Sequence, residues 1–593
     1  MYLQTTLLSL ATLSTLAASA GILHKKADIS SVPPSAWSSL NSTVSGKVGA
    51  LYPMGAFCYA QYEGSLNTHV NLAQCAALQA SQTITTYQAQ FPQGYSYSTW
   101  PMCVAKSQSC NTQGLLPADP VTPLVGNCRQ GTVPNYVVDA RSDSDIKATL
   151  AFAKKYNIPL VIKASGHDYK GRSAGQGALM LWVYNYRPAM QLQKNFVPAG
   201  ASSPVGDVMT FAAGHDMEAV LGFADQNGGA VISGTAKSLH PAGGFLQGGG
   251  HSPLSPSWGL AVDDTHEIRA ILADGTSVTA SRNQNQDVFF ALAGGGPSTF
   301  GVVTQVSMLL HPNPAQGYQF AQFAMVGLTD QSASQLLKVL IANAEQWAKD
   351  GWGGYAFPGL ASNHTNLVVL VNPKMSNADA QKSLAPLTAF MATLPSGNVA
   401  LNQIMSHEGY KEVWDSLTNG DVALQGGGVS LSSRIVPVDN FRGSANQQKL
   451  FNAIYPIVNA FGSTAREPLF MCLTAPYQYP AKSSSVTPAW YKGLWHVIAL
   501  NEWNPQSSTS DIKGQFKKSH DVIQPLVSLT PGSGAYQNEA DTLETDPVGA
   551  YWGQANYNRL SSIKKSVDPT NLLTVWQGVG WNNADARWSC YPN

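Results

Sequence analysis

The sequence predicts an α+β protein with one ligand-binding domain and a second domain built on an antiparallel sheet covered by helices. Three observations support this class. A strand–helix–strand unit occupies residues 135–164, short strands with glycine-rich turns continue to about residue 310, and helical stretches alternate with strand-like ones from about 315 to 530. The 593 residues are enough polypeptide for several domains.

The first unit begins with NYVVDA (135–140), an apolar run of strand length. Ser142 is a candidate N-cap for the next stretch, in which Ile146 and Leu150 recur at helical spacing. IPLVIKA (158–164) then predicts a second strand. Ligands often bind where such strands end, so the loop that leaves this second strand is a candidate site.

Strands are predicted next at 178–184, 207–214, 267–275 and 300–310. The second domain is predicted to contain a helix at 330–350 and strands at 365–372 and 494–503. The C-terminal part predicts a helix from about 551 that Asp568-Pro569 stops. A buried strand in LLTVWQGVGW (572–581) is expected to follow it.

Composition and charge exclude several classes of partner. Hydrophobic residues make up 44% of the chain and charged residues 12%, with 35 basic and 35 acidic side chains. A neutral chain has no general attraction to nucleic acid or acidic membranes. No run beyond the N-terminus is apolar enough to span a bilayer. We therefore expect a small-molecule substrate, no nucleic acid, no membrane and a monomer.

The N-terminus predicts secretion. Residues 1–20 form an apolar run that ends in Ala-Ser-Ala, typical of a signal peptide cut after Ala20. The run lacks a basic start, so a buried N-terminal helix is the alternative. Lys25-Lys26 is a possible second processing site, and sequons at Asn41 and Asn363 agree with an extracellular protein.

Cysteine usage agrees with secretion. The chain has seven cysteines, Cys58, Cys75, Cys103, Cys110, Cys128, Cys472 and Cys590. Five of them crowd into the first 130 residues, which predicts disulfides in a secreted chain. The odd count leaves one free thiol, for which Cys472 in the apolar run LFMCLTA is the candidate. No C-x-x-C spacing is present, so no metal site is expected.

Three glycine-rich loops lie in the first domain. They are KASGHDYKGRSAGQG (163–177), PAGGFLQGGGHSPLSPSWG (241–259) and AGGGPSTFGVVT (293–304). Backbone N–H groups that turn inward in such loops form concavities suited to a pyrophosphate. Three of them predict a long ligand such as a dinucleotide. The G-x-G-x-x-G fingerprint between strand and helix is absent, so a Rossmann site is not expected.

These loops, the 135–173 segment, AYQNEAD (535–541) and the 551–573 helix together resemble the FAD-linked oxidases of the vanillyl-alcohol-oxidase and berberine-bridge-enzyme superfamily. More narrowly, the chain is similar to secreted fungal isoamyl-alcohol-oxidase-like and 6-hydroxy-nicotine-oxidase-like proteins. The resemblance implies a PCMH-type (p-cresol-methylhydroxylase-type) FAD-binding domain of two subdomains. The implied divisions are a Cys-rich segment at 21–129, the FAD domain at 130–313, a substrate domain at 314–530 and a C-terminal segment at 531–593 that returns to the FAD domain.

The resemblance implies how FAD is held. In that family the histidine of G-H-x-x-x-G bonds covalently to the flavin 8-methyl group, and His167 is its match. The alternative is a turn histidine bonded to backbone. The expected FAD contacts are Ser165, Gly166, His167, Asp168, Gly171, Arg172, Ser173, Gly243, Gly244, Gly248, Gly249, His251, Gly301, Val303, Asn556 and Tyr557.

Many relatives form a second bond from a cysteine to the flavin. That position falls here on Ala236 or Lys237, so a single tether is expected. Relatives with two tethers tend to have open sites for bulky substrates. The departure therefore argues against an oligosaccharide substrate.

FAD supplies the electron chemistry, and the protein must supply a base for the hydroxyl proton. Relatives often place a tyrosine at the end of Y-x-N-Y, whereas this chain has Glu539 there, three residues after Tyr536. Glu539 is the candidate base, especially if burial raises its pKa toward neutrality. A structural salt bridge or helix cap is the alternative. Tyr536, Asn556 and Tyr557 are expected near the isoalloxazine.

Other polar residues receive structural interpretations. His240 and His251 flank the second glycine loop without an acidic partner at metal-ligand spacing, which favours loop hydrogen bonding, although His251 can also touch FAD. His215 lies in a second Gly-His-Asp triplet without the following G-R-S, which we interpret as coincidence. Glu502-Trp503 and Asp263-Asp264 are left open between site and structural roles.

The predicted function is a secreted, monocovalent FAD oxidase that oxidises an alcohol or related donor and reduces oxygen to hydrogen peroxide. A biosynthetic oxidoreductase for a fungal secondary metabolite is one alternative, and a non-catalytic glycine-rich binding protein is another. No G-x-S-x-G motif is present, which excludes a typical serine hydrolase.

Overall fold

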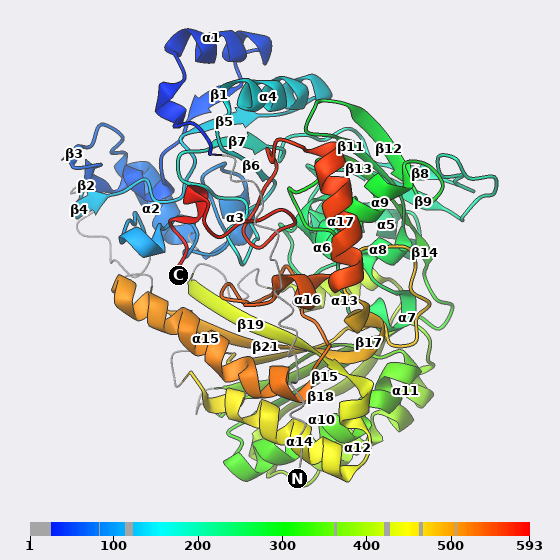
Figure 1. The fold of residues 1–593 in the computed structure, drawn as a ribbon. Helices are drawn as coiled ribbons and strands as arrows, with labels where there is room; N and C mark the ends of the chain where they lie inside the picture. The colour runs from blue at the N-terminus through cyan, green and yellow to red at the C-terminus, as the bar shows by residue number, and fades with distance from the viewer. Residues whose placement is uncertain are drawn as a thin grey trace, which may run out of the picture.

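In the computed structural model, a four-stranded and a five-stranded sheet lie in one half of the molecule, and a seven-stranded sheet lies in the other half (Figure 1). The structure describes residues 25–592 except 82, 113–122, 361–363, 420–426, 462–466 and 505–506. The predicted signal peptide and the sequon asparagine Asn363 lie outside the described residues. Within them, helices are too short or too polar to cross a bilayer. The predicted α+β class is confirmed.

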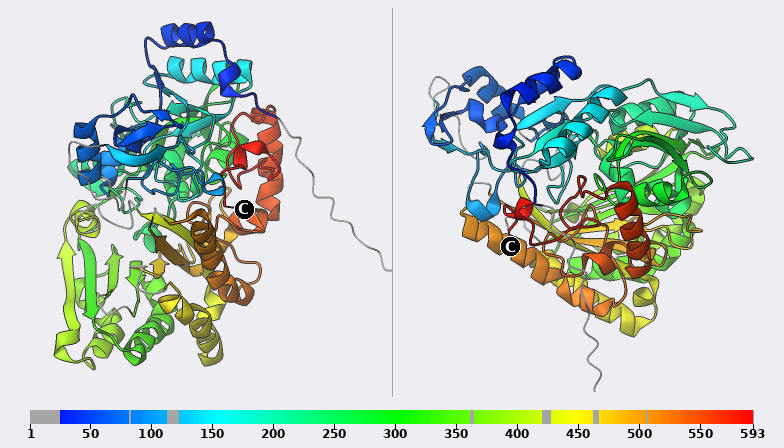
Figure 2. Two further views of the ribbon diagram at one scale, coloured as in Figure 1. Left: turned by 90° about the vertical axis from the view of Figure 1, so that its left-hand side faces the viewer. Right: turned by 45° about the horizontal axis from the view of Figure 1, so that its top comes forward.

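The strand–helix–strand unit forms a four-stranded sheet. In spatial order its strands are β1 (Val48–Ala50), β5 (Tyr136–Asp139), β7 (Leu179–Trp182) and β6 (Leu160–Lys163). α4 (Asp143–Tyr156) connects β5 to β6 and begins at the predicted N-cap, where the Ser142 side chain accepts from the Asp145 N–H. The Cys-rich segment contributes β1, which pairs antiparallel with β5, and α1 (Pro34–Thr43), which lies against α4 (Figure 2).

An antiparallel five-stranded sheet follows in the same half of the molecule. In spatial order its strands are β12 (Ser277–Ser281), β11 (Thr265–Ile271), β13 (Val302–Leu309), β9 (Val208–Ala212) and β8 (Gln191–Gln193). α5 (Met217–Gln226) and α9 (Gln286–Leu292) pack with this sheet in the same hydrophobic core. All four strands predicted between 178 and 310 are confirmed as β7, β9, β11 and β13.

The second half is a seven-stranded antiparallel sheet. In spatial order its strands are β18 (Val399–His407), β15 (Tyr318–Val326), β17 (Thr365–Asn372), β16 (Gly353–Phe357), β20 (Leu469–Leu473), β21 (Gly493–Trp503) and β19 (Gly428–Pro437). The helices on its outer face are α10 (Asp330–Asp350), α12 (Ala385–Met391), α14 (Ser444–Ile454) and α15 (Thr509–Leu529). The predicted helix at 330–350 and the strands at 365–372 and 494–503 are confirmed.

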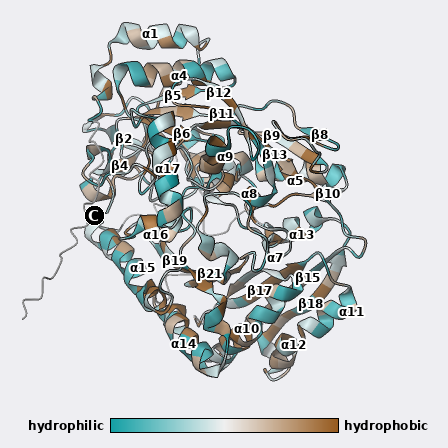
Figure 3. Cartoon of the chain, turned by 45° about the vertical axis from the view of Figure 1, so that its right-hand side comes forward, coloured by the Kyte–Doolittle hydropathy of each residue, from teal (hydrophilic) through white to brown (hydrophobic). Residues whose placement is uncertain are grey.

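Strand alternation places this large sheet between two cores. Phe320 and Val369 point to one face and pack with the first domain, whereas Ala321 and Val368 point to the other and pack under the helices. Figure 3 shows hydrophobic colour along the interior strands and hydrophilic colour on outer helices such as α11 (Asn377–Ser383). One face of the sheet is therefore available to form a wall toward the glycine loops.

The C-terminal part confirms the helix but not the strand. α17 (Gln554–Val567) ends at Asp568 as predicted. Residues 572–581 form turns rather than a strand, so that prediction was wrong. Gln577 and Gly580 have positive φ angles of 52° and 85°, which interrupt an extended chain. The apolar side chains there are buried nonetheless, and burial without a strand explains the error.

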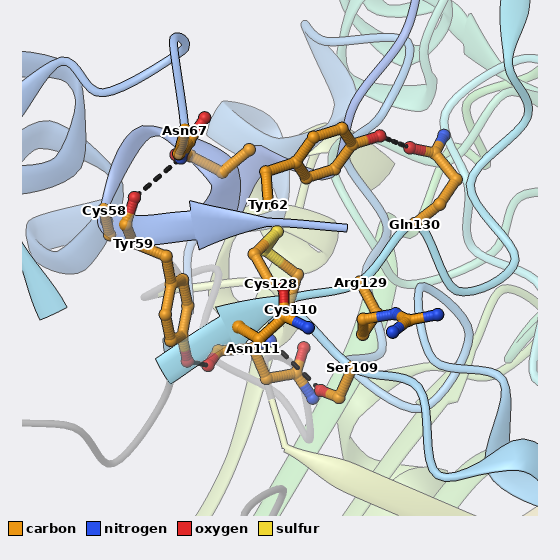
Figure 4. Close-up of a disulfide and its surroundings, with 12 residues drawn as sticks. Cys58, Tyr59, Tyr62, Asn67, Ser109, Cys110, Asn111, Cys128, Arg129 and Gln130 are labelled. Atoms are coloured by element: carbon orange, nitrogen blue, oxygen red, sulfur yellow. Dashed lines mark hydrogen bonds between the residues drawn. A yellow bond between two sulfur atoms is a disulfide. The ribbon is translucent and has the colours of Figure 1, made fainter. Parts of the chain in front are cut away.

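Three disulfides form, Cys58–Cys75, Cys103–Cys590 and Cys110–Cys128, and the predicted free thiol Cys472 is buried. Figure 4 shows the Cys110–Cys128 bond beside β2 (Tyr59–Tyr62), where Tyr62 and Gln130 also share a hydrogen bond. Cys103–Cys590 joins residues 487 positions apart. It anchors the C-terminus, where the Tyr591 hydroxyl donates to the Lys170 carbonyl at 2.8 Å.

We expect the double variant Cys103→Ser/Cys590→Ser to lose about 2–5 kcal/mol of unfolding free energy, because the bond closes a very long loop. Cys58→Ser/Cys75→Ser, which opens a loop of 17 residues, is the control and should lose less. Denaturant titration of the three proteins measures both losses. An equal or smaller loss in the long-loop variant would contradict the expectation.

Candidate active site

A cavity of about 430 Å³ lies where the glycine-rich loops meet the inner face of the seven-stranded sheet. The predicted site residues that line it are Ser165, Gly166, His167, Asp168, Arg172, Ser173, Gly243, Gly244, His251, Gly301, Val303, Tyr536 and Glu539. They come from segments almost 400 positions apart in the chain. The fold thus assembles most of the predicted set in one place.

The first loop begins where β6 ends, as the strand–helix–strand pattern predicts. Gly166 has φ +97°, and a Cβ there would lie 3.0 Å from the Gly94 carbonyl oxygen, so only glycine fits without strain. His167 follows, and its Nε2 lies 2.8 Å from the Ser238 hydroxyl, a residue that the sequence did not single out. This contact fixes how the imidazole ring is presented to the cavity.

A polar network ties the first loop to the C-terminal segment. Arg172 donates to the Asp168 carboxylate at 2.6 Å and to Asn538 Oδ1 at 2.8 Å. Asn538 in turn donates to the Gly244 carbonyl at 2.8 Å, in the second glycine loop. Gly248 allows this approach, because a Cβ there would lie 2.1 Å from the Asn538 amide nitrogen.

The neighbours of Asn538 complete the connection. The Tyr536 hydroxyl receives a hydrogen bond from the Asn538 amide at 2.8 Å and donates to the Phe245 carbonyl at 3.3 Å. Gln537 donates to the Gly294 carbonyl at 2.6 Å, in the third glycine loop. The Tyr-Gln-Asn-Glu segment therefore connects all three glycine-rich loops by hydrogen bonds around the cavity.

Five predicted cofactor contacts do not line the cavity. They are Gly171, Gly248, Gly249, Asn556 and Tyr557. A Cβ on Gly171 would lie 2.4 Å from the Trp100 ring, so this glycine serves packing. Asn556 donates to the Val486 carbonyl at 3.0 Å, and Tyr557 packs on Trp552. The structure thus does not support the predicted position of Asn556 and Tyr557 beside an isoalloxazine.

The residues left open behave as structural groups. Glu502 and Trp503 are buried but do not line the cavity. Asp263 accepts hydrogen bonds from the Tyr491 hydroxyl and the Leu260 N–H, both at 2.9 Å, and so fixes its own loop. His240 is the loop hydrogen-bonder that the sequence predicted, since its Nδ1 donates to the Ala213 carbonyl at 2.8 Å.

The wall nearest His167 fits a large, flat and partly polar ligand. A Cβ on Gly243 or Gly244 would meet no atom closer than 3.8 Å, so these glycines leave open space at the cavity. Among the described residues, Ser173 Oγ, Gln247 Oε1 and His240 Nε2 are buried cavity atoms without a hydrogen-bond partner. Buried polar atoms are rarely left unpaired, so these three point to a polar ligand such as FAD.

Burial lowers the pKa of His240 to about 3, so its ring is neutral at ordinary pH. Because Nδ1–H donates its hydrogen bond to the Ala213 carbonyl, Nε2 is a buried acceptor on a residue that lines the cavity. The polar wall therefore offers both a hydroxyl donor in Ser173 and acceptors in His240 and Gln247.

Glu539 lies among histidines rather than alone. Its Oε2 is 3.1 Å from His251 Nε2 and 3.5 Å from His496 Nδ1. Burial raises the pKa of the Glu539 carboxyl, but the charge and hydrogen bond of His251 more than offset this and leave it below its usual value. The favourable condition of a pKa raised toward neutrality is therefore not met. His251 has no acidic partner at metal-ligand spacing in the sequence, and the structure supplies one from 288 positions away, Glu539.

The opposite wall of the cavity is largely apolar and was not predicted. Tyr355, Phe357 and Phe470 come from neighbouring strands β16 and β20, and the Phe357 and Phe470 rings stack at 4.8 Å. Tyr97 of the Cys-rich segment stacks on Tyr169 at 4.2 Å, and both line the cavity. Strand pairing brings Phe357 and Phe470 together, and tertiary packing brings Tyr97 to Tyr169, so no local motif marks these aromatic residues.

Ala236 lines the cavity and Lys237 lies 3.9 Å from Glu218. Neither of the two positions considered for a second tether therefore presents a thiol. Cys472 does not line the cavity. The single tether remains a prediction that these positions favour.

The loop that carries Glu539 is held from behind by His520 of α15, which hydrogen-bonds Asp541. That bond raises the pKa of His520. Because the pKa of His520 is higher in the folded protein than in the unfolded one, the protonated side chain stabilises the fold. This stabilisation is fully present below the unfolded-state pKa of about 6.5 and is lost as pH rises through the folded-state pKa.

We expect His520→Gln to lose about 1 kcal/mol more unfolding free energy, relative to wild type, near pH 5.5 than near pH 8.5. Denaturant titrations of both proteins at the two pH values measure the difference. Equal losses at both values would show that the pair contributes no charge-dependent stability.

Comparison with known families agrees with this site. Residues 134–281 match the FAD binding domain family, and residues 535–580 match the berberine and berberine-like family. The chain is 30% identical to an uncharacterized FAD-linked oxidoreductase of Arthroderma benhamiae. The alignment of 584 residues covers 94% of this chain and 93% of that protein. It is 27% identical to a VAO-type flavoprotein oxidase of Thermothelomyces thermophilus, over 92% of this chain and 90% of that protein.

Solved structures show the same fold. A VAO-type flavoprotein of Myceliophthora thermophila superposes with a TM-score of 0.82 at 25% identity, covering 95% of this chain and 99% of that chain. The 6-hydroxy-D-nicotine oxidase of Arthrobacter nicotinovorans superposes with a TM-score of 0.62 at 19% identity, covering 76% and 92%. At 19% identity, the similarity to the second structure supports the fold and not the function.

Proposed function

This chain belongs to the FAD-linked oxidoreductases of the vanillyl-alcohol-oxidase type with a berberine-like C-terminal segment, and we propose that it is a secreted oxidase acting on alcohols or related donors. Membership of an enzyme family removes the alternative of a non-catalytic binding protein. One observation carries the proposal. The cavity joins a glycine-lined polar wall that contains His167 to a wall made mainly of aromatic and aliphatic side chains, and Glu467 is a charged residue that also lines the cavity.

The residues on the polar wall are those that would hold the cofactor. His167 would hold FAD covalently, and Ser173, Gln247 and His240 offer the unpaired polar atoms that suit its polar edges. When bound, FAD accepts hydride from the donor and passes the electrons to oxygen, which yields hydrogen peroxide. The chain itself contributes binding, orientation and proton handling.

Glu539 is the proposed base. Its carboxylate lines the cavity and is ionised at neutral pH, because its pKa lies below the usual value. It can therefore accept the hydroxyl proton of a donor alcohol in the cavity. His251 holds the carboxylate at 3.1 Å and is itself held by Thr474, which lies 3.0 Å from its Nδ1. Tyr536 is a positioning residue, since its hydroxyl is engaged by Asn538 and Phe245.

The apolar wall favours a second candidate within the same chemistry, a biosynthetic oxidoreductase for a hydrophobic secondary metabolite. Tyr355, Phe357, Phe470 and Leu367 offer ring and aliphatic surface but few hydrogen-bonding groups. A sugar oligomer needs many such groups, so these residues support apolar or aromatic donors over oligosaccharides. Secretion is supported by the three disulfides, which persist in oxidising compartments.

A substrate panel tests the proposal. The purified flavoprotein is mixed with aliphatic, benzylic and polycyclic alcohols and with oligosaccharides, while flavin bleaching without oxygen and peroxide release with oxygen are recorded. We expect apolar alcohols to bleach the flavin and release peroxide. Bleaching without peroxide would favour the biosynthetic dehydrogenase, and bleaching by oligosaccharides alone would contradict the interpretation of the apolar wall.

A further inference from the structure

Four side chains with metal-binding atoms, one of which is the proposed base, meet beside the cavity. His251, Cys472, His496 and Glu539 each offer one ligand atom, and these four atoms all lie within 4.8 Å of one another. Cys472 and His496 are fully buried, His251 is 6% exposed and the Glu539 side chain is 20% exposed. Two imidazoles, one thiol and one carboxylate are a donor set that zinc accepts.

The large sheet itself creates half of this cluster. Cys472 on β20 and His496 on β21 are direct cross-strand partners, so their side chains leave the same face of the sheet. The other half comes from loops, with His251 inside the second glycine loop and Glu539 in the C-terminal segment. No sequence spacing signals a site that is built from four separate segments.

His496 is the observation that points to a ligand. Its side chain is completely buried, and the backbone and carboxylate of Glu539 are its polar neighbours. Within the described part of the chain, neither ring nitrogen has a hydrogen-bond partner in good geometry. Its Nδ1 is 3.5 Å from Glu539 Oε2, too long for a good bond. A buried imidazole without partners loses its hydration without compensation, and a bound ion would supply the missing partner.

The spacing is close to what zinc requires. Zn–N distances of about 2.0–2.1 Å and Zn–S distances of about 2.3 Å in a tetrahedron place ligand atoms roughly 3.3–3.8 Å apart. The 3.1 and 3.5 Å separations around Glu539 Oε2 already fall near this range. The limit of 4.8 Å for the whole set means that the most distant pair must approach by up to about 1.5 Å, which side-chain rotation can supply.

His251 also has the outer contact typical of a zinc ligand. Its Nδ1 lies 3.0 Å from the Thr474 hydroxyl, which can accept a hydrogen bond from Nδ1–H and leave the Nε2 lone pair toward the cluster. We infer that His251 Nε2, His496 Nδ1, Cys472 Sγ and Glu539 Oε2 form a binding site for one zinc-class divalent ion. The thiol proton leaves to solvent on binding, and both imidazoles bind as neutral ligands.

The site does not depend on the proposed function. An ion that holds Glu539 prevents that carboxylate from accepting a proton, so the two uses of Glu539 exclude each other at any one time. Metal binding is measured without substrate or turnover. Failure of the metal site would therefore leave the proposed base intact, and failure of the base would leave the metal site intact.

The experiment uses the full-length flavoprotein, freed of metal by a chelator and dialysed against zinc. We expect about one zinc per chain. Cys472→Ser and His496→Gln should each weaken binding more than about 100-fold, and Thr474→Val, which keeps every ligand, about 10- to 100-fold. His407→Gln is the matched control, because it removes another His–Glu pair, 3.0 Å from Glu412, and should bind zinc as wild type does.

Cobalt in place of zinc gives a second readout. The other six cysteines are in disulfides, so a thiolate-to-cobalt charge-transfer band in the difference spectrum can come only from Cys472. The inference is overturned if wild type retains no zinc and shows no such band, or if Cys472→Ser binds both ions as tightly as wild type. Should a variant not fold, the wild-type stoichiometry and cobalt spectrum still decide.

Discussion

Glu539→Gln is expected to lower kcat/KM by about 10²- to 10⁴-fold while the protein keeps its flavin. Glutamine preserves the size of the side chain but cannot accept the hydroxyl proton. Glu539 lines the cavity, whereas no covalent attachment is proposed for it, so flavin content should not change. Anaerobic flavin reduction by the best alcohol of the panel measures the chemical step directly.

Glu502→Gln is the matched control for this prediction. Glu502 is also a buried glutamate, on β21, but it does not line the cavity. Its variant should reduce flavin at a rate close to that of wild type. A Glu539→Gln protein that stays within about threefold of wild type would remove Glu539 from the role of base.

Asp568→Ala should be the most destabilising single change outside the cavity, with a loss of about 3–5 kcal/mol of unfolding free energy. Asp568 is fully buried and lies 2.7 Å from the buried Lys564 Nζ, and it also accepts the N–H groups of Leu572 and Leu573. Burial lowers the pKa of Lys564, and Asp568 opposes that shift. Alanine would leave a buried ammonium without its counter-ion.

Asp521→Ala is the control, because Lys517–Asp521 has the same i,i+4 spacing on an exposed helix face. It should change the unfolding free energy by less than about 1 kcal/mol. Lys564→Met/Asp568→Leu, which removes both buried charges, should recover part of the loss. Similar losses from Asp568→Ala and Asp521→Ala in denaturant titrations would contradict this account of the buried pair.

Local signals predicted the part of the site that is written in contiguous sequence. The loop after β6 follows a periodic strand–helix–strand pattern, so the loop could be located from the sequence alone, and the family resemblance then pointed to His167 within it. The helix that ends at Asp568 was equally clear from its Asp-Pro stop. Such features depend on neighbours in sequence, which pattern reasoning can see.

The remainder of the site depends on strand pairing and long loops. Cys472 meets His496 only because β20 pairs with β21, and Glu539 meets His251 across 288 positions. Tyr97, from the Cys-rich segment, reaches the cavity through tertiary packing alone. The incorrect prediction of a strand at 572–581 has a similar cause. An apolar segment that tertiary packing buries among loops has the same sequence pattern as a buried strand.

Intact mass of the denatured, deglycosylated polypeptide tests the covalent flavin most directly. We predict that wild type exceeds its polypeptide mass by one FAD, that His167→Ala does not, and that His215→Ala, which alters the similar Gly-His-Asp triplet, still does. A wild-type chain without the added mass, or a His167→Ala chain that retains it, would contradict attachment through His167.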